Sequence, residues 1–331
     1  MKHLTLITVF FYVNFSYCQD YIRYHQIRMK AEKAILDTNY SDAVAIYDAL
    51  FNEYDFVFAK HIYTATQTAI ENNDLEKAFD FITKGVLQGI KINEVDNDSI
   101  LVKLKKDPRW DEFELRYDSL RKIYIGNVNW EARNFINKMY DIDQEYRDRH
   151  ELKKWNFVLR PFIRMKWNKV LEEMVKKNLS PLIDSLGFPG ERLVGLDERW
   201  MHQKRRNDGL ESTFVFFILI HYYSKPRDTL LNKMIYNEIK TGYILPEKYA
   251  ALIDFQAEWG KDKFYKGIHY NQWHTSNQEN IYDRIEFNRA EIGLESLEVL
   301  ELKRKRSFKI IKELNNGNMH HHIKLWHIGG Y

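Results

Sequence analysis

The sequence predicts a mainly α-helical protein in two parts, a short helical-repeat unit followed by a compact, mostly helical domain. Three observations support this fold class. The first 107 residues contain no proline and the first 125 contain only two glycines, so helices can continue without interruption. Small and apolar residues recur at a fixed spacing in this stretch. From residue 181 onward glycine and proline return, which places a domain boundary near residues 130–140.

Composition excludes several classes of protein. Hydrophobic residues make up 44% of the 331 residues and aromatic residues 15%, which is too much for a disordered chain. The formal charge of +3, from 50 basic and 47 acidic side chains, indicates no nucleic-acid partner. The chain has a single cysteine, Cys18, which excludes a disulfide framework and a cysteine-based zinc site.

Residues 1–18 have the pattern of a secretory signal peptide. A short polar start precedes an apolar stretch, residues 4–15, and the small residues Ser16 and Cys18 stand just before a cleavage at Gln19. The sequence therefore predicts an exported protein, periplasmic or extracellular, with no transmembrane segment after cleavage. Two alternatives stay open, a lipid anchor at Cys18 and a retained N-terminal anchor.

The N-terminal part, residues 20–130, carries an internal repeat. Ala34, Tyr40 and Ala43 recur as Ala69, Leu75 and Ala78, at an offset of 35 residues. A polar turn separates two helical patterns in each copy, Asp37-Thr38-Asn39 in the first and Asn72-Asn73-Asp74 in the second. Over roughly residues 21–90 this resembles the tetratricopeptide repeat, although the helix-ending proline of that family is absent. The resemblance implies stacked helix pairs with a concave binding surface; an irregular bundle without a groove is the alternative.

Helical patterns continue through the C-terminal part, residues 140–310. We expect a helix pair over 160–186 broken near Pro181, an apolar helix over 211–223, an amphipathic helix over 228–241, a helix from Pro246 to Glu258, and helices over 278–290 and 294–314. A strand is an alternative for 211–223, since aromatic and β-branched residues are frequent there. Residues 311–331 are expected to form a tail.

A series of motifs runs through residues 143–300. It comprises Asp143-Gln144 with Arg147, Gly187-Phe188-Pro189, Val194-Gly195, His221 at the end of an apolar helix, Gly242, Ala250 with Leu252 and Asp254, Gly260, Tyr265, and Arg289 before Gly293-Leu294. In order and spacing these motifs resemble a bacterial domain family of unknown function. The chain departs from the family pattern where Ile220 replaces a glutamine, Tyr222-Tyr223 replace an acidic residue, Phe255 replaces an arginine, and Lys266-Gly267-Ile268 replace Gly-Thr-Gln. The resemblance therefore implies no particular reaction.

Five polar residues are the candidates for a functional site: Arg147, His221, Asp254, Tyr265 and Arg289. His221 can act as an acid or a base near neutral pH, and Asp254 and Tyr265 are the further catalytic candidates. Arg147 and Arg289 are candidates for binding a carboxylate or phosphate ligand. The structural alternative is a hydrogen-bonded histidine and an Arg–Asp pair that stabilises the domain, because buried charges need partners.

No motif indicates a metal or a cofactor. The histidines at 320–322 are adjacent, which is not the spacing of a metal site. The sequence has neither a Gly-x-Ser-x-Gly motif nor a glycine-rich phosphate-binding loop. Residues 301–312 carry six basic groups, which fits contact with anionic lipid or a polyanion, or a solvated helix face.

The leading functional hypothesis is an extracytoplasmic binding protein whose helical repeats hold a protein or peptide partner. It requires an exposed apolar groove in the repeats. The alternative is an extracytoplasmic, hydrolase-like enzyme, which requires the five polar candidates to meet in one open cleft. A purely structural envelope protein is the third hypothesis.

Overall fold

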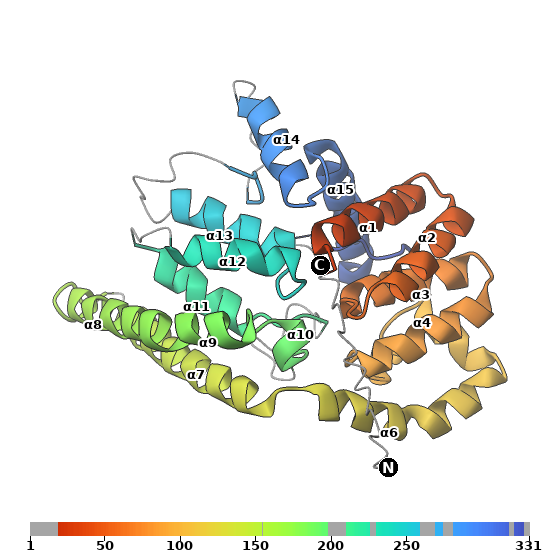
Figure 1. Ribbon diagram of the computed structural model, residues 1–331, viewed down its shortest axis with the longest axis horizontal. Helices are drawn as coiled ribbons and strands as arrows, with labels where there is room; N and C mark the ends of the chain where they lie inside the picture. The colour runs from red at the N-terminus through yellow and green to blue at the C-terminus, as the bar shows by residue number, and fades with distance from the viewer. Residues whose placement is uncertain are drawn as a thin grey trace, which may run out of the picture.

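The computed structural model describes residues 19–153, 155–197, 210–225, 230–258, 269–273, 281–317 and 321–327. These residues form fifteen α-helices, one 3-10 helix and one π-helical turn, without any strand (Figure 1). The predicted mainly α-helical fold class is confirmed. The predicted signal peptide, with Cys18, and the candidate Tyr265 lie outside the described residues.

Four N-terminal helices form two pairs, α1 (Tyr21–Leu36) with α2 (Tyr40–Glu53) and α3 (Ala59–Glu71) with α4 (Leu75–Leu87). The turns within the two pairs are alike. Thr38 and Asn73 have φ angles of 59° and 58°, and the next residue in each turn, Asn39 or Asp74, caps the following helix with its side-chain oxygen. The sequence repeat is thus matched by a repeated turn geometry, while membership of the tetratricopeptide family stays a prediction.

A run of shorter elements leads to the second part. It consists of α5 (Asn93–Asp96), the 3-10 helix η1 (Leu101–Lys106) and α6 (Arg109–Asn127). Four apolar residues of these elements, Leu101, Leu104, Trp110 and Phe113, are buried in the same core as the helix pairs. After two residues α6 is followed by α7 (Trp130–Leu152), a helix that runs through the predicted boundary at 130–140 (Figure 1).

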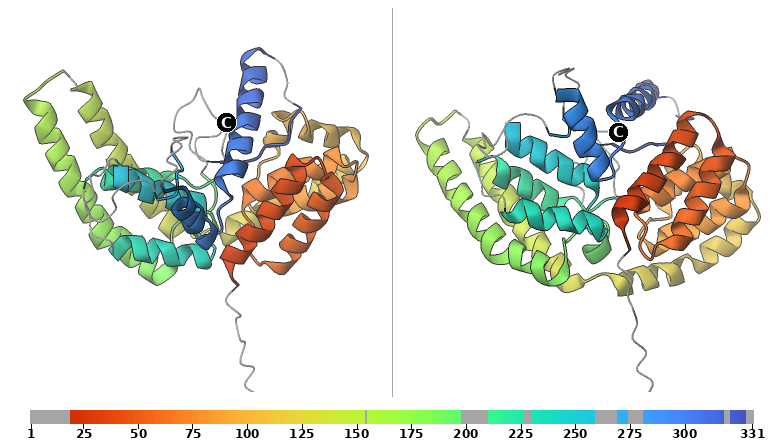
Figure 2. Two further views of the ribbon diagram at one scale, coloured as in Figure 1. Left: turned by 90° about the horizontal axis from the view of Figure 1, so that it is seen from above. Right: turned by 45° about the horizontal axis from the view of Figure 1, so that its top comes forward.

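The C-terminal part begins with a long hairpin of α7 and α8 (Leu159–Met174), which projects from the other helices in Figure 2. A π-helical turn, η2 (Val175–Leu179), connects α8 to α9 (Ser180–Leu186), so the expected break near Pro181 is a change of helix type. The remaining helices are α10 (Glu191–Val194), α11 (Phe214–Tyr223), α12 (Leu230–Lys240), α13 (Pro246–Glu258), α14 (Tyr282–Glu291) and α15 (Leu297–Asn315). The apolar stretch 211–223 is therefore mainly a helix and not a strand.

The C-terminal segment, residues 321–327, packs against α3 instead of extending from the fold. The Lys324 amide donates to Gln67 Oε1 at 2.8 Å, and Thr64 Oγ1 donates to the Lys324 carbonyl at 2.8 Å. The Trp326 indole donates to Thr64 Oγ1 at 3.1 Å, and its ring packs on Tyr63. Every residue of α3 from 59 to 70 is buried, because α2, α4 and η1 pack on this helix as well as the C-terminal segment. The helix therefore presents no open groove.

A buried network of charges joins the first helix pair to the C-terminal part. Lys303 Nζ of α15 lies 2.6 Å from Glu32 and 3.3 Å from Glu295, and Arg28 Nη1 of α1 lies 2.5 Å from Glu32. All four side chains are buried. Because two cations face two anions, each charge has the partner that burial requires.

A second group of ion pairs lies between α3 and α13. Lys60 Nζ contacts Glu247 and, at 3.1 Å, Glu211, and Glu211 also accepts from Lys248 at 2.5 Å. His61, one residue after Lys60, is buried, and burial lowers its pKa well below the ordinary value. The imidazole therefore stays neutral and adds no charge to this group.

We predict that Lys303→Met lowers the free energy of unfolding by about 3–5 kcal/mol at neutral pH, because it leaves two buried carboxylates with one cation. Urea denaturation measures this. The control is Lys305→Met in the same helix, whose side chain is 66% exposed and which should change the free energy by no more than about 0.5 kcal/mol. Equal effects of the two substitutions would contradict a stabilising network.

We also predict a pH dependence from Glu295. Burial raises the pKa of this carboxyl, but Lys303 and Arg28 outweigh burial and hold the pKa far below its ordinary range. Its stabilising contribution is therefore complete above the unfolded pKa of about 4.3 and is lost as the pH falls toward the folded pKa. The difference in unfolding free energy between wild type and Lys303→Met should therefore become smaller below about pH 4. A difference that does not change with pH would show that the Glu295 carboxylate does not contribute to it.

Candidate functional site

A histidine–aspartate pair lies between α7, α8 and α11. His221 Nδ1 lies 2.7 Å and 2.9 Å from the two carboxylate oxygens of Asp143. The same carboxylate accepts from Trp167 Nε1 at 3.0 Å and from Gln144 Nε2 at 2.8 Å. Asp143 is fully buried, so these donors replace the water that it loses on folding.

The sequence of α7 explains why an aspartate is buried here. Ala132, Ile136, Met139 and Tyr140 form the inward stripe of this helix, and Asp143 takes the next position at helical spacing. This spacing turns the carboxylate toward the neighbouring helices. His221 reaches it from the last turn of α11.

The pair fixes the orientation of the imidazole. Because a carboxylate has no proton to donate, this contact favours the tautomer that carries its hydrogen on Nδ1, with Nε2 directed away from Asp143. The side chain of His221 is 20% exposed, whereas that of Asp143 is 0% exposed. This arrangement, a buried carboxylate behind a partly exposed imidazole, is the one that a general base requires.

Three side chains that the sequence analysis did not single out surround the pair. The rings of Trp167 and His221 lie 4.9 Å apart in an edge-to-face contact. Arg164 lies one turn before Trp167, with its guanidinium 4.9 Å from the indole ring, and donates to Ser224 Oγ at 2.7 Å. A positive charge is therefore placed next to the last turn of α11.

The candidate Arg147 lies one turn after Asp143 on α7. Its guanidinium donates to Asp148 at 3.0 Å, and its side chain is 30% exposed. No described hydrogen bond or ion pair connects it with His221 or Arg289. The structure thus places Arg147 on the same helix as the pair, but in contact with a neighbouring surface carboxylate.

The candidates Asp254 and Arg289 hold a different part of the fold. Asp254 accepts from the backbone amides of three residues in the segment 269–273, at 2.8–2.9 Å. Arg289 donates to the Glu295 carbonyl at 2.6 Å and to Gln272 Oε1 at 3.1 Å. Both are buried, and burial raises the pKa of Asp254 and lowers that of Arg289. These contacts favour the structural alternative, in which both charges fix this segment, although no direct ion pair between them is described.

We predict that Asp254→Ala lowers the free energy of unfolding by about 2–3 kcal/mol, because three buried amides lose their acceptor. Thermal or urea unfolding measures the loss. Asp283→Ala, at an exposed position on the neighbouring α14, is the control and should have little effect. If Asp254→Ala were as stable as the control, a structural role of this aspartate would be untenable.

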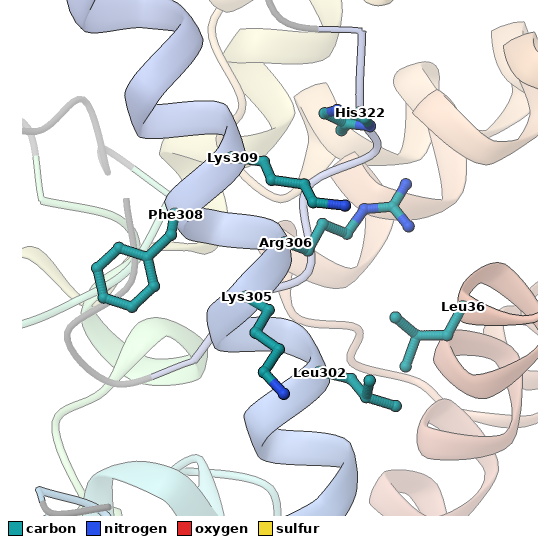
Figure 3. Close-up of a pocket in the computed structure, with 7 residues that line it drawn as sticks. All are labelled: Leu36, Leu302, Lys305, Arg306, Phe308, Lys309 and His322. Carbon is teal, nitrogen blue, oxygen red and sulfur yellow. The ribbon is translucent and has the colours of Figure 1, made fainter.

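A groove of about 570 Å³ lies elsewhere, between α15, the end of α1 and the C-terminal segment (Figure 3). It is lined by Leu36, Leu302, Lys305, Arg306, Phe308, Lys309 and His322. Figure 3 shows Leu36 and Leu302 on one side of α15 and Phe308 on the other. Two cations are engaged locally, Arg306 with the Ile323 carbonyl and Lys305 with Glu301. Lys305 is largely exposed, whereas Lys303 of the same stretch is buried. The exposed part of residues 301–312 therefore fits a solvated basic face.

Comparison with known protein families, with curated proteins and with solved structures gives no match to this chain. The resemblances to the tetratricopeptide repeat and to the bacterial domain family therefore stay predictions. The function of the histidine–aspartate pair has to be argued from its own geometry.

Two further properties concern metals and membranes. In the described ranges, histidine, cysteine, aspartate and glutamate side chains form no group of three or more that could hold a metal ion. None of the described helices has the length and apolar composition that crossing a bilayer demands.

Proposed function

We propose, from the histidine–aspartate pair alone, that the protein is an exported, hydrolase-like enzyme in which His221 is the general acid–base group and Asp143 orients it. The described residues do not bring the five polar candidates into one cleft, because Arg147, Asp254 and Arg289 have other partners. The observation that carries this proposal is the 2.7 Å contact between His221 Nδ1 and the fully buried Asp143, on an imidazole that is itself partly exposed. The pattern of residues 1–18 supports export.

The proposed reaction is hydrolysis of an ester. His221 Nε2 takes a proton from water as the water oxygen attacks the carbonyl or phosphoryl centre. The Asp143 carboxylate stabilises the imidazolium that forms, and Arg164 lies close enough to α11 to offset negative charge on the substrate. The imidazolium then returns its proton to the departing alkoxide, so one water is added across the ester bond.

We predict that His221→Gln lowers kcat at least about 100-fold toward the esters of p-nitrophenol that the wild type hydrolyses, because a glutamine cannot accept the proton. Carboxylic and phosphoric esters should both be tested, with release of p-nitrophenol as the readout. His150→Gln is the matched control, since both ring nitrogens of His150 already contact neighbours, Glu151 and Arg160. An unchanged rate in His221→Gln, or a wild type inactive on every ester, would refute the proposal.

The role of Asp143 can be tested without a substrate. Nitrogen-15 NMR of the histidine side chains should show His221 with its proton on Nδ1 in the wild type. Asp143→Asn should abolish this preference at His221. The side-chain signals of the other histidines should stay unchanged. A His221 protonated on Nε2 in the wild type would contradict the proposed base.

Binding of a peptide by the helical repeats is a second candidate function, favoured by the way the C-terminal segment lies on α3. Lys324 is held through its backbone amide and carbonyl, and Trp326 packs as an anchor. An external peptide of similar chemistry would have to displace this segment. A chain truncated after Gly317 should bind a synthetic peptide of residues 318–331 in calorimetry, and the same peptide with Trp326→Ala should bind at least about tenfold more weakly.

A further inference from the structure

The turn between α7 and α8 exposes an unusual number of large apolar side chains. Leu152, Trp155 and Phe157 are 82%, 80% and 86% exposed. Val158, Leu159, Phe162 and Met165 are also exposed. We refer to residues 152–169 as the hairpin tip. Figure 2 shows this turn at the far end of the hairpin, away from the other helices.

The exposed side chains continue from the turn onto one side of α8. Val158, Phe162 and Met165 follow one another at intervals of four and three residues, which places them on one helical stripe. Trp167 lies on the inward side and is buried against α7 and α11. The tip therefore has an apolar outer surface, and a separate face that packs into the protein.

The turn itself is well organised. Asn156 Oδ1 accepts from the backbone amides of Leu159 at 2.8 Å and Val158 at 3.2 Å, and the Asn156 amide donates to the Lys153 carbonyl at 2.8 Å. These bonds satisfy the first amides of α8 and fix the turn. The aromatic side chains on either side of Asn156 are thus presented to solvent by a hydrogen-bonded turn.

The charge of the tip has one sign. Residues 152–169 contain six basic side chains and no acidic one. Directly before this range, Glu151 lies 3.9 Å from Arg160, and Arg164 donates to Ser224 beside the histidine–aspartate pair. The exposed Lys153, Lys166 and Lys169 are therefore the charges that the tip presents to a partner. Tryptophan and phenylalanine with surrounding lysine and arginine are the residues that favour the interface of an anionic bilayer.

We propose that the hairpin tip inserts its apolar side chains into the head-group region of an anionic membrane. The aromatic and aliphatic groups supply buried area, and the exposed lysines of the tip supply attraction to lipid phosphates. A second copy of the chain is a poorer occupant of this surface, because residues 152–169 of one tip hold no carboxylate that could offset the basic groups of another. This proposal concerns a different surface from the proposed catalytic pair and does not depend on its activity.

The test is cosedimentation of the full chain with vesicles of phosphatidylcholine, alone or with about one third phosphatidylserine. We expect binding to the anionic vesicles only, weakening as the salt concentration rises. Phe157→Ser with Phe162→Ser should lower the partition coefficient at least about tenfold, since two apolar side chains no longer insert. Replacing Lys153, Lys166 and Lys169 with Gln should lower it about a hundredfold.

Matched controls separate the tip from other parts of the chain. Leu115→Ser with Phe287→Ser removes two equally exposed apolar side chains elsewhere. Replacing Lys305, Lys309 and Lys312 with Gln removes three charges from α15. All variants keep the same N-terminus, so binding by residues 1–18 contributes equally to each. Circular dichroism verifies that every variant is folded.

The results distinguish a membrane from a second copy of the chain as the partner of the hairpin tip. Loss of binding in the tip variants, with the controls unchanged, supports the proposal. Wild-type binding by the tip variants, or no wild-type binding to anionic vesicles, overturns it. A dimer in analytical ultracentrifugation that only the tip variants abolish would assign this surface to a second copy and would also overturn it.

Discussion

The arrangement of the helices depends on charged side chains that are buried between the first helix pair and the C-terminal part. Lys303 and Arg28 share two glutamates, and Lys60 lies between two more. Each group is nearly balanced in charge, and such pairs tolerate little displacement because a separated charge stays buried. This requirement fixes α1 and α3 against α13 and α15 more specifically than apolar contact alone.

The same constraint explains which surfaces are left for function. The C-terminal segment covers α3, and Asp254 with Arg289 fixes residues 269–273, so these polar groups are used inside the fold. The α7–α8 hairpin takes no part in the charge network. Its inner face is held through Asp143 and Trp167, while its outer end makes no contribution to either hydrophobic core. The hairpin therefore carries both Asp143, the partner of the partly exposed His221, and the exposed apolar side chains of the tip.

Local sequence signals predicted the local structure well. The absence of proline, the 35-residue offset and the helical periodicity gave most helices, including the buried α11 and the two similar turns at Thr38 and Asn73. Contacts between distant residues were not predictable in this way. Lys303 is one of six similar basic residues in residues 301–312, and nothing in its neighbourhood marks it as the buried one. Asp143 and His221 were both noted in the sequence, yet their pairing over 78 positions appears only in the fold.

A signal for the hairpin tip was present in the sequence. Residues 152–169 contain four aromatic and six basic side chains and no carboxylate. A count of acidic residues would have distinguished this segment from the basic stretch of α15, which contains Glu301. Asp143 precedes Leu152 by nine residues on the same helix, which is about 14 Å at 1.5 Å per residue. Insertion of the tip by about 5–10 Å would leave the histidine–aspartate pair outside the apolar layer but close to the head groups. Because the pair uses the inner face of the hairpin and the tip its outer face, substitutions at Phe157 and Phe162 leave the contacts of His221 intact. We therefore expect the proposed catalysis and the proposed membrane attachment to be lost separately, so that each can be tested in a variant that lacks the other.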